Sequence, residues 1–253
     1  MRIRAVMINT FREAIRHKVL FLLVAFAFLT IACAKLIQPL ALGEHPKITR
    51  DLGLSAITLF GLLIAIFVGT RLVYEEMEKR TLYLILPKPV KRWEFLLGKY
   101  LGLLLVITIS ILLIFLTFYA YLFLEEKRLD LNLLIALPFI WMELSLVTAI
   151  ALLFSTFTTP IASGIFTFLL FFAGHLSRDI KVIGEMTKAP LVKGIAQALY
   201  YILPNLSNFN VKGEVVHQVP IPISQMVYAM AYGLLYISLL LLLSILIFEK
   251  KDL

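Results

Sequence analysis

The chain of 253 residues is 61% hydrophobic and only 16% charged, with a mean hydropathy of +0.94. Ordinary soluble domains contain about 45–50% apolar and about 25% charged residues, so this composition excludes a water-soluble globule and places much apolar surface against membrane lipids. The net charge of +8 therefore bears on membrane sidedness rather than on nucleic acid, and the single cysteine, Cys33, excludes an internal disulfide or a Cys-rich metal site.

The first residues show the periodicity of an amphipathic helix, with Arg2, Arg12, Glu13 and Arg16 on one side. The apolar positions on the other side are Ile3, Val6, Met7, Phe11, Ala14 and Ile15. This pattern predicts an interfacial helix on the cytoplasmic face with its arginines near anionic head groups, and a charge cluster that only sets topology is the alternative. The basic start followed by Ala32-Cys33-Ala34 also resembles a secretory signal, but the length and pattern of the leader favour its retention.

Six apolar stretches are long enough to cross a bilayer, since a spanning helix needs about 20 mostly apolar residues to cover the ~30 Å hydrocarbon core. The predicted spans cover residues 19–38, 52–74, 98–124, 131–154, 158–176 and 223–248. Runs of this length satisfy backbone hydrogen bonds internally, and they lack the alternation of a β-barrel. We therefore predict an all-α membrane protein with six transmembrane helices, formed by a single domain over residues 1–253.

Lys and Arg are concentrated in segments that the positive-inside rule assigns to the cytoplasm. The leader and the connection between spans two and three are both basic, and six crossings return the C-terminus, with Lys250 and Lys251, to the same side. The outer segment 177–222 has a weak basic excess, which is tolerable because the rule is strongest for short loops. We expect both termini in the cytoplasm and the protein in the cell (inner) membrane.

The connection between spans two and three has the most specific pattern of the chain. Its first part continues span two as a helix until Pro87 and Pro89 stop it, because proline removes a donor and clashes with the preceding turn. A new helix is expected near Trp93, with Glu94 in the first turn, where the helix dipole favours a carboxylate. The pattern predicts a charged cytoplasmic elbow, and an ordinary basic loop is the alternative.

Two further features lie outside that elbow. Residues 195–203 form a semi-apolar run too short to span, which predicts a re-entrant or interfacial helix, with a loosely ordered loop as the alternative. Glu143 lies near the middle of span four, where an ionised carboxylate costs about 2.5–3.5 kcal/mol, so it should face protein or water or be protonated. It is a candidate lining residue of a path or subunit interface, or a structural residue hydrogen-bonded to a neighbouring span.

The elbow resembles the cytoplasmic loop of type-2 ABC exporter permeases. The residues that carry the resemblance are Glu75, Glu76 and Glu78, then Arg80-Thr81-Leu82, Pro89-Val90-Lys91-Arg92 and Phe95-Leu96-Leu97-Gly98-Lys99. The resemblance extends over essentially the whole chain, from the leader through the six spans and the long outer segment. Among those permeases the chain is most similar to membrane subunits associated with maturation of multicopper enzymes such as nitrous-oxide reductase, through residues 203–209 preceded by Tyr200 and Tyr201.

The resemblance implies the membrane subunit of an exporter that pairs with a second permease and docks a separate ABC ATP-binding subunit. It also implies a cytoplasmic coupling helix and an outer helical cap between spans five and six. The expected coupling surface consists of Glu75, Glu76, Glu78, Arg80, Leu82 and Arg92. The phosphate-loop pattern G-x-x-x-x-G-K-S/T is missing at Gly98-Lys99, so ATP is expected on the partner, and the chain itself is expected to be no enzyme and to hold no cofactor or metal.

Two other function classes compete with a permease. Intramembrane CAAX-type proteases use patterns that Glu75-Glu76-x-x-x-Arg80 and Phe171-x-x-x-His175 match, but the topology places these groups about 30 Å apart, beyond the reach of general-base chemistry. A secondary transporter driven by ions or protons is the other alternative, although no charge ladder across other spans accompanies Glu143. His175, Met186, His217 and Met226 lie toward the outer side without the local spacing of metal ligands.

Overall fold

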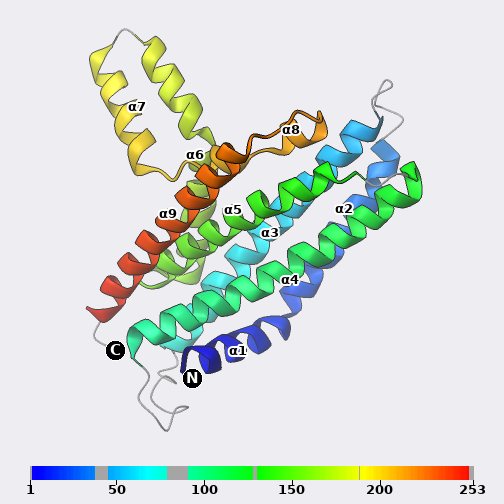
Figure 1. Ribbon diagram of the computed structural model, residues 1–253. Helices are drawn as coiled ribbons and strands as arrows, with labels where there is room; N and C mark the ends of the chain where they lie inside the picture. Colours follow the sequence, from blue (N-terminus) through cyan, green and yellow to red (C-terminus); the bar gives the residue numbers. More distant parts are fainter. Residues whose placement is uncertain (1, 38–44, 79–90, 128–129, 188, 251–253) are drawn as a thin grey trace.

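The computed structural model describes residues 2–37, 45–78, 91–127, 130–187 and 189–250, of which 34–37, 45–46 and 72–78 are described by their backbone alone. These segments are helical and contain no strand, which confirms the predicted all-α class (Figure 1). The elements in chain order are α1 (Arg2–Ile15), α2 (Lys18–Ile37), α3 (His45–Glu78), α4 (Arg92–Glu126), α5 (Asn132–Ser155), α6 (Pro160–Met186), α7 (Pro190–Ile202), the 3-10 helix η3 (Leu206–Phe209), α8 (Lys212–Val216) and α9 (Ile223–Glu249).

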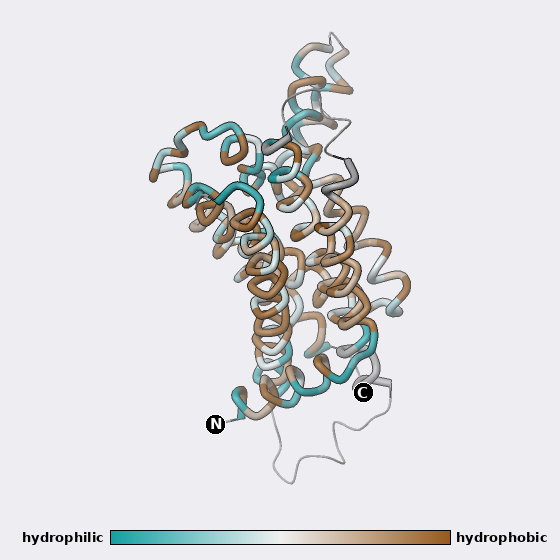
Figure 2. The backbone as a smooth tube through the Cα atoms, turned by 90° about the vertical axis from the view of Figure 1, so that its right-hand side faces the viewer, coloured by the Kyte–Doolittle hydropathy of each residue, from teal (hydrophilic) through white to brown (hydrophobic). Residues whose placement is uncertain are grey.

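Five of the described helices are long and apolar enough to cross a membrane: α3 over Lys47–Arg71, α4, α5, α6 and α9. A sixth crossing arises if the bent pair α1 and α2 counts as one span, with an angle of 63° between its two parts. The long helices are mainly apolar along their length in Figure 2. A polytopic helical membrane protein with five to six spans therefore agrees with the sequence.

Both chain ends lie at the same end of the molecule (Figure 1), which is called the inner end below because the sequence predicts it to be cytoplasmic. The opposite end is called the outer end. Predicted span five, residues 158–176, lies largely within α6, but that helix continues to Met186. The short helix predicted at residues 195–203 lies largely within α7, which begins earlier, at Pro190.

Helix α5 occupies the centre of the bundle and contacts α3, α4, α6 and α9. Its sequence is apolar on all sides, which is the pattern of a helix surrounded by other protein. Most of its residues from Phe139 to Leu152 are buried, and Glu143 lies in this run. The central helix of the bundle therefore carries the charged residue that the sequence placed in span four.

The leader α1 packs along the first turns of α4. A side chain at Gly98 would meet Val6 at 2.6 Å, and one at Gly102 would meet Thr10 at 2.6 Å, so two glycines spaced by four residues let the helices approach closely. Val6, Thr10 and Ala14 are the buried residues of α1. Part of the apolar face that the sequence assigned to the membrane interface therefore packs on α4. The placement of α1 at the lipid surface stays a prediction.

The outer segment has two parts. The outer half of α6 and helix α7 form a hairpin that projects from the bundle (Figure 1). The two helices pack against each other where Gly184 faces Ala196. The chain then returns over the bundle as η3 and α8, which contact α3, α5 and α6. Leu206, Phe209 and Val215 are buried there. This return places polar residues of the outer segment close to the central helices.

Candidate functional site

The predicted coupling surface lies at the inner end. Helix α3 continues without interruption from its apolar part to Glu78, so the backbone of Glu75, Glu76 and Glu78 forms the last turns of that helix. The side chains of these three acids, and the whole of Arg80 and Leu82, lie outside the described residues. The structure therefore places the three acids on a helical extension of α3 and leaves their role a prediction.

Arg92, the sixth residue of that predicted surface, makes defined contacts. It begins α4, and its guanidinium donates hydrogen bonds to the carbonyl oxygens of Phe248 at 3.0 Å and Glu249 at 2.8 Å. These carbonyls lie at the C-terminus of α9, where a cation interacts favourably with the helix dipole. Arg92 therefore ties the start of α4 to the end of α9. Glu94 lies in the first turn of α4, as predicted.

A second inner-end contact was missed by the sequence reasoning. The Lys99 ammonium lies 3.5 Å from the Glu13 carboxylate and 5.7 Å from the centre of the Phe95 ring, and its side chain is 1% exposed. The signal that would have revealed this packing is the G-x-x-x-G spacing of Gly98 and Gly102, which favours close helix contact. Lys99 therefore belongs to the α1–α4 contact rather than to a phosphate-binding loop.

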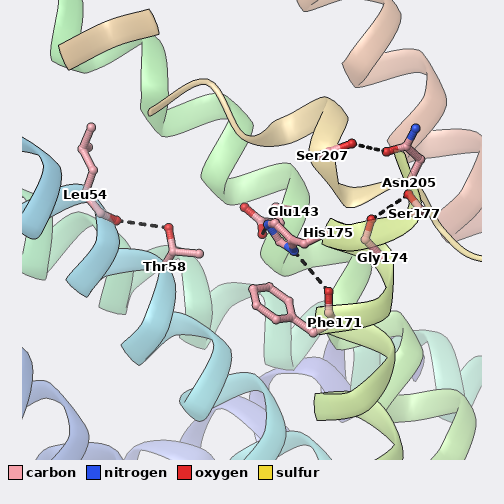
Figure 3. Close-up of polar contacts among 9 residues, drawn as sticks. All are labelled: Leu54, Thr58, Glu143, Phe171, Gly174, His175, Ser177, Asn205 and Ser207. Atoms are coloured by element: carbon pink, nitrogen blue, oxygen red, sulfur yellow. Dashed lines mark hydrogen bonds and ion pairs between the residues drawn. The ribbon is translucent and has the colours of Figure 1, made fainter. Parts of the chain in front are cut away.

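Glu143 faces a neighbouring span, as its cost of burial required. Its carboxylate is 0% exposed, and Oε1 lies 3.1 Å from Nε2 of His175 on α6 (Figure 3). Among the described residues neither Oε1 nor Oε2 has a hydrogen-bond partner, so the approach to His175 is a close ion-pair contact without the geometry of a hydrogen bond. The sequence reasoning did not foresee His175 as the partner, because it treated the two residues as isolated ionisable groups in different spans.

One further charge of the outer half, Lys212, acts on this pair, and Asp51 acts on Lys212. Lys212 on α8 is largely buried, and Asp51 lies in the first part of α3. Burial lowers the pKa of the Lys212 ammonium, and the charges of Glu143 and Asp51 oppose that shift. The return of the outer segment over the bundle therefore brings a second cation toward Glu143.

An apolar groove of about 710 Å³ runs between the inner halves of α3 and α6. Arg71 and Thr70 are its polar lining residues, and the Thr70 hydroxyl already donates to the carbonyl of Ile66 at 2.7 Å. The other lining residues are Leu63, Ile66, Phe67, Pro160, Ile161, Gly164, Ile165, Phe168 and Leu169. The groove is thus a surface that lipid or another apolar chain can fill.

The protease alternative fails on distance. Gly164 of α6 lies against Ile66 of α3, with 3.2 Å between an added Cβ and that side chain. His175 is about 16 Å along α6 toward the outer end from this point, and Glu75 is about 13 Å along α3 toward the inner end. The two patterns are therefore about 30 Å apart, which no direct or water-mediated hydrogen bond spans. Within the described part of the chain, no three His, Cys, Asp or Glu gather as a metal site would require.

The five to six long apolar helices define a multi-pass membrane protein. A family model described as "ABC-2 family transporter protein" matches residues 4–253, and the chain belongs to that family. Comparison with curated proteins gives no significant match. The chain is therefore a transmembrane permease component of an ABC transporter. Such components are generally not catalytic themselves and work with an ATP-binding subunit.

Proposed function

We propose that this chain is the membrane subunit of an ATP-driven exporter and that a separate ATP-binding subunit docks at the end of α3. The observation that carries the proposal is the continuity of α3, a single helix of 34 residues from His45 to Glu78. A continuous helix transmits motion because its backbone hydrogen bonds run along its whole length. Movement imposed on Glu75–Glu78 would therefore reach the bundle directly.

The contacts beside α3 support this arrangement. Arg92 holds the start of α4 to the end of α9, and α1 packs on α4 through Gly98 and Gly102. Helix α4, which follows the predicted coupling segment, is thus a fixed part of the bundle rather than a free end. Lys99, packed against Glu13 and Phe95, is not placed to bind a phosphate, which agrees with ATP bound on the partner.

The proposed assembly contains two permeases, as the sequence resemblance implies. A link to multicopper enzyme maturation rests on residues 203–209 and the preceding Tyr200 and Tyr201. In the structure this stretch includes η3, whose Leu206 and Phe209 pack into the outer end of the bundle. Burial of these two side chains accounts for Leu206 and Phe209 without any reference to a cargo.

Charge reversal at the end of α3 tests the coupling. We expect Glu76→Lys with Glu78→Lys to reduce co-purification of the ATP-binding subunit at least about tenfold. The introduced lysines would repel basic residues of the subunit that the native glutamates attract. The thermal stability of the permease should not change. Glu185→Lys is the matched control, since it reverses an exposed acid at the outer end of α6. Unchanged binding by the reversed variant, or no ATPase bound by the native chain, would contradict the proposal.

A proton- or ion-driven secondary transporter is the second candidate, and one observation favours it. The Glu143–His175 pair places two ionisable groups inside the bundle, where carriers hold their coupling protons. Reconstituted permease without any ATP-binding subunit separates the two classes. Transport driven by a pH gradient alone would establish the carrier, and an absolute requirement for the ATPase would exclude it.

A further inference from the structure

His175 makes two contacts through its two ring nitrogens. Nδ1 lies 3.1 Å from the carbonyl oxygen of Phe171, one turn earlier on α6, and Nε2 lies 3.1 Å from Oε1 of Glu143 on α5 (Figure 3). The Glu143 side chain is 0% exposed and that of His175 is 23% exposed. The ring therefore links its own helix to a carboxylate that water does not reach.

The donors and acceptors of these contacts do not balance without an added proton. A carbonyl oxygen only accepts, so Nδ1 must carry a hydrogen to bond Phe171. A neutral imidazole then presents a lone pair at Nε2, and an ionised carboxylate likewise presents only lone pairs. Two acceptors 3.1 Å apart repel each other. The contact is attractive only if the pair carries one added proton, on Nε2 of His175 or on the carboxyl group of Glu143.

We propose that Glu143 and His175 form a proton-binding site inside the helix bundle, which holds one proton on the pair and loads it from the outer end. The proton comes from water at the partly exposed ring. With the proton bound, the pair is neutral overall, either as imidazolium with carboxylate or as imidazole with carboxylic acid. Without it, the pair carries one buried negative charge. The site does not depend on the ATP-binding subunit.

Loss of the proton removes one contact whichever tautomer forms. If Nδ1 keeps its hydrogen, Nε2 faces the carboxylate with a lone pair. If Nε2 takes the hydrogen, Nδ1 faces the Phe171 carbonyl with a lone pair. A rise in pH on the outer side therefore weakens either the α5–α6 contact or the anchoring of the ring on α6.

The elements packed around the pair supply few other charges. Helix α8 contributes Lys212, whose charge acts on both residues of the pair, while Asp51 of α3 acts on Lys212. The Tyr232 hydroxyl of α9 is engaged elsewhere, because it accepts a hydrogen bond from the backbone N–H of Asn205 at 2.8 Å. No direct ion pair joins the described side chains of Lys212 and Glu143. Lys212 therefore offsets part of the charge of a deprotonated pair without replacing the added proton.

The test compares the native permease with Glu143→Gln. The side-chain amide that this substitution introduces can donate an N–H to Nε2, so the contact persists without an added proton. Difference titration of the purified full chain between about pH 5 and pH 8 should show one proton fewer bound by the variant. The unfolding temperature of the native chain should fall by about 3–5 °C as pH rises through the titration, and that of Glu143→Gln should stay level.

His217→Gln is the matched control, because it removes an exposed histidine of the same outer segment. It should keep the pH dependence of the native chain. Equal pH dependence in the native chain and Glu143→Gln would overturn the proposal. In sealed vesicles of known orientation, the titration should follow the pH on the side opposite the chain termini. A response to the other side alone would overturn loading from the outer end.

A spectroscopic measurement on the unaltered chain covers the case in which the variant does not fold. Nitrogen NMR of the four histidines, with His175→Gln used for assignment, reports which ring nitrogens carry hydrogen. The infrared carboxyl band reports whether Glu143 is protonated. A doubly protonated His175, or a protonated Glu143, supports the site. A neutral His175 beside an ionised Glu143 at neutral pH overturns it.

Discussion

The two ends of the bundle bury charge in different ways. At the inner end, Lys99 has a side chain that is 1% exposed, but its partner Glu13 is 37% exposed and remains in contact with water. In the outer half, Glu143 is 0% exposed and its partner His175 only 23%. Substitution of one member of an ion pair costs little stability when the other member is solvated, whereas a fully buried carboxylate needs a partner at all times. The outer pair should therefore be the more sensitive of the two.

The largest expected effect comes from removing both basic side chains near Glu143. We expect His175→Ala with Lys212→Ala to lower the free energy of unfolding by about 3–5 kcal/mol, because the buried carboxylate is left without compensation. Adding Glu143→Gln should restore most of the loss by removing that charge. Unfolding of the purified chain measures both effects, with His217→Ala plus Lys193→Ala as the exposed control pair. A triple variant as unstable as the double one would contradict this explanation.

At the inner end, the contact between α1 and α4 depends on space rather than charge. Gly102→Leu would place its Cβ 2.6 Å from the Cβ of Thr10 and 2.8 Å from the carbonyl oxygen of Met7. We expect a loss of about 1–3 kcal/mol and a faster cleavage of α1 by protease. Gly194→Leu is the control, because nothing lies within 4 Å of a Cβ added at that glycine on α7. Equal proteolysis of the two variants would show that α1 does not depend on the glycine contact.

Arg92→Ala should have a smaller effect. It removes the hydrogen bonds to the carbonyls of Phe248 and Glu249, and charged hydrogen bonds of this kind contribute about 1.5–3 kcal/mol before exposure is considered. Because one of the two is exposed, we expect a loss of about 1–2 kcal/mol in thermal or denaturant unfolding without any ATP-binding subunit present. A variant that loses ATPase binding at native stability would instead place Arg92 in the coupling surface alone.

The smallest expected effect belongs to a partly buried ion-pair cluster at the outer end. The Arg50 guanidinium lies 2.7 Å from Glu126 and 3.1 Å from Asp130, and so joins α3 to the end of α4. Arg50→Gln should cost about 1 kcal/mol, because the Gln amide can still donate to one of the two carboxylates, and the difference should shrink partly at high salt because the cluster still reaches solvent. Arg178→Gln, at an exposed site on α6, is the control. A loss that salt does not alter would show that Arg50 acts through packing.

The free-energy cost of burying a charge made the environment of Glu143 predictable from the sequence. An ionised carboxylate is too costly in a lipid-facing position, so the sequence required Glu143 to face protein or water, and it faces α6. The identity of its partner was not predictable, because nothing local to Glu143 indicates which turn of α6 packs against α5. The helix start near Trp93 followed from prolines and Glu94, both of which act within a few residues.

Other assignments were incomplete because they depended on distant chain segments. Arg92 was grouped with the coupling residues through the family resemblance, yet its partners lie on α9, far away along the chain. The face of α1 was assigned to lipid from its periodicity alone, yet Val6 and Thr10 lie against glycines of α4. An apolar face reports that a side is buried, but not whether lipid or protein covers it.

By itself, the sequence determined that this protein is a bundle of membrane-spanning helices, because backbone groups in lipid must be satisfied within each helix and that requirement is local. It also determined that Glu143 needs a partner or a proton. Only the tertiary structure decided that His175 is the partner, that Lys212 returns toward the pair on α8, and that α1 lies on α4. Those contacts join helices far apart in the chain, and side-chain packing between helices selects them.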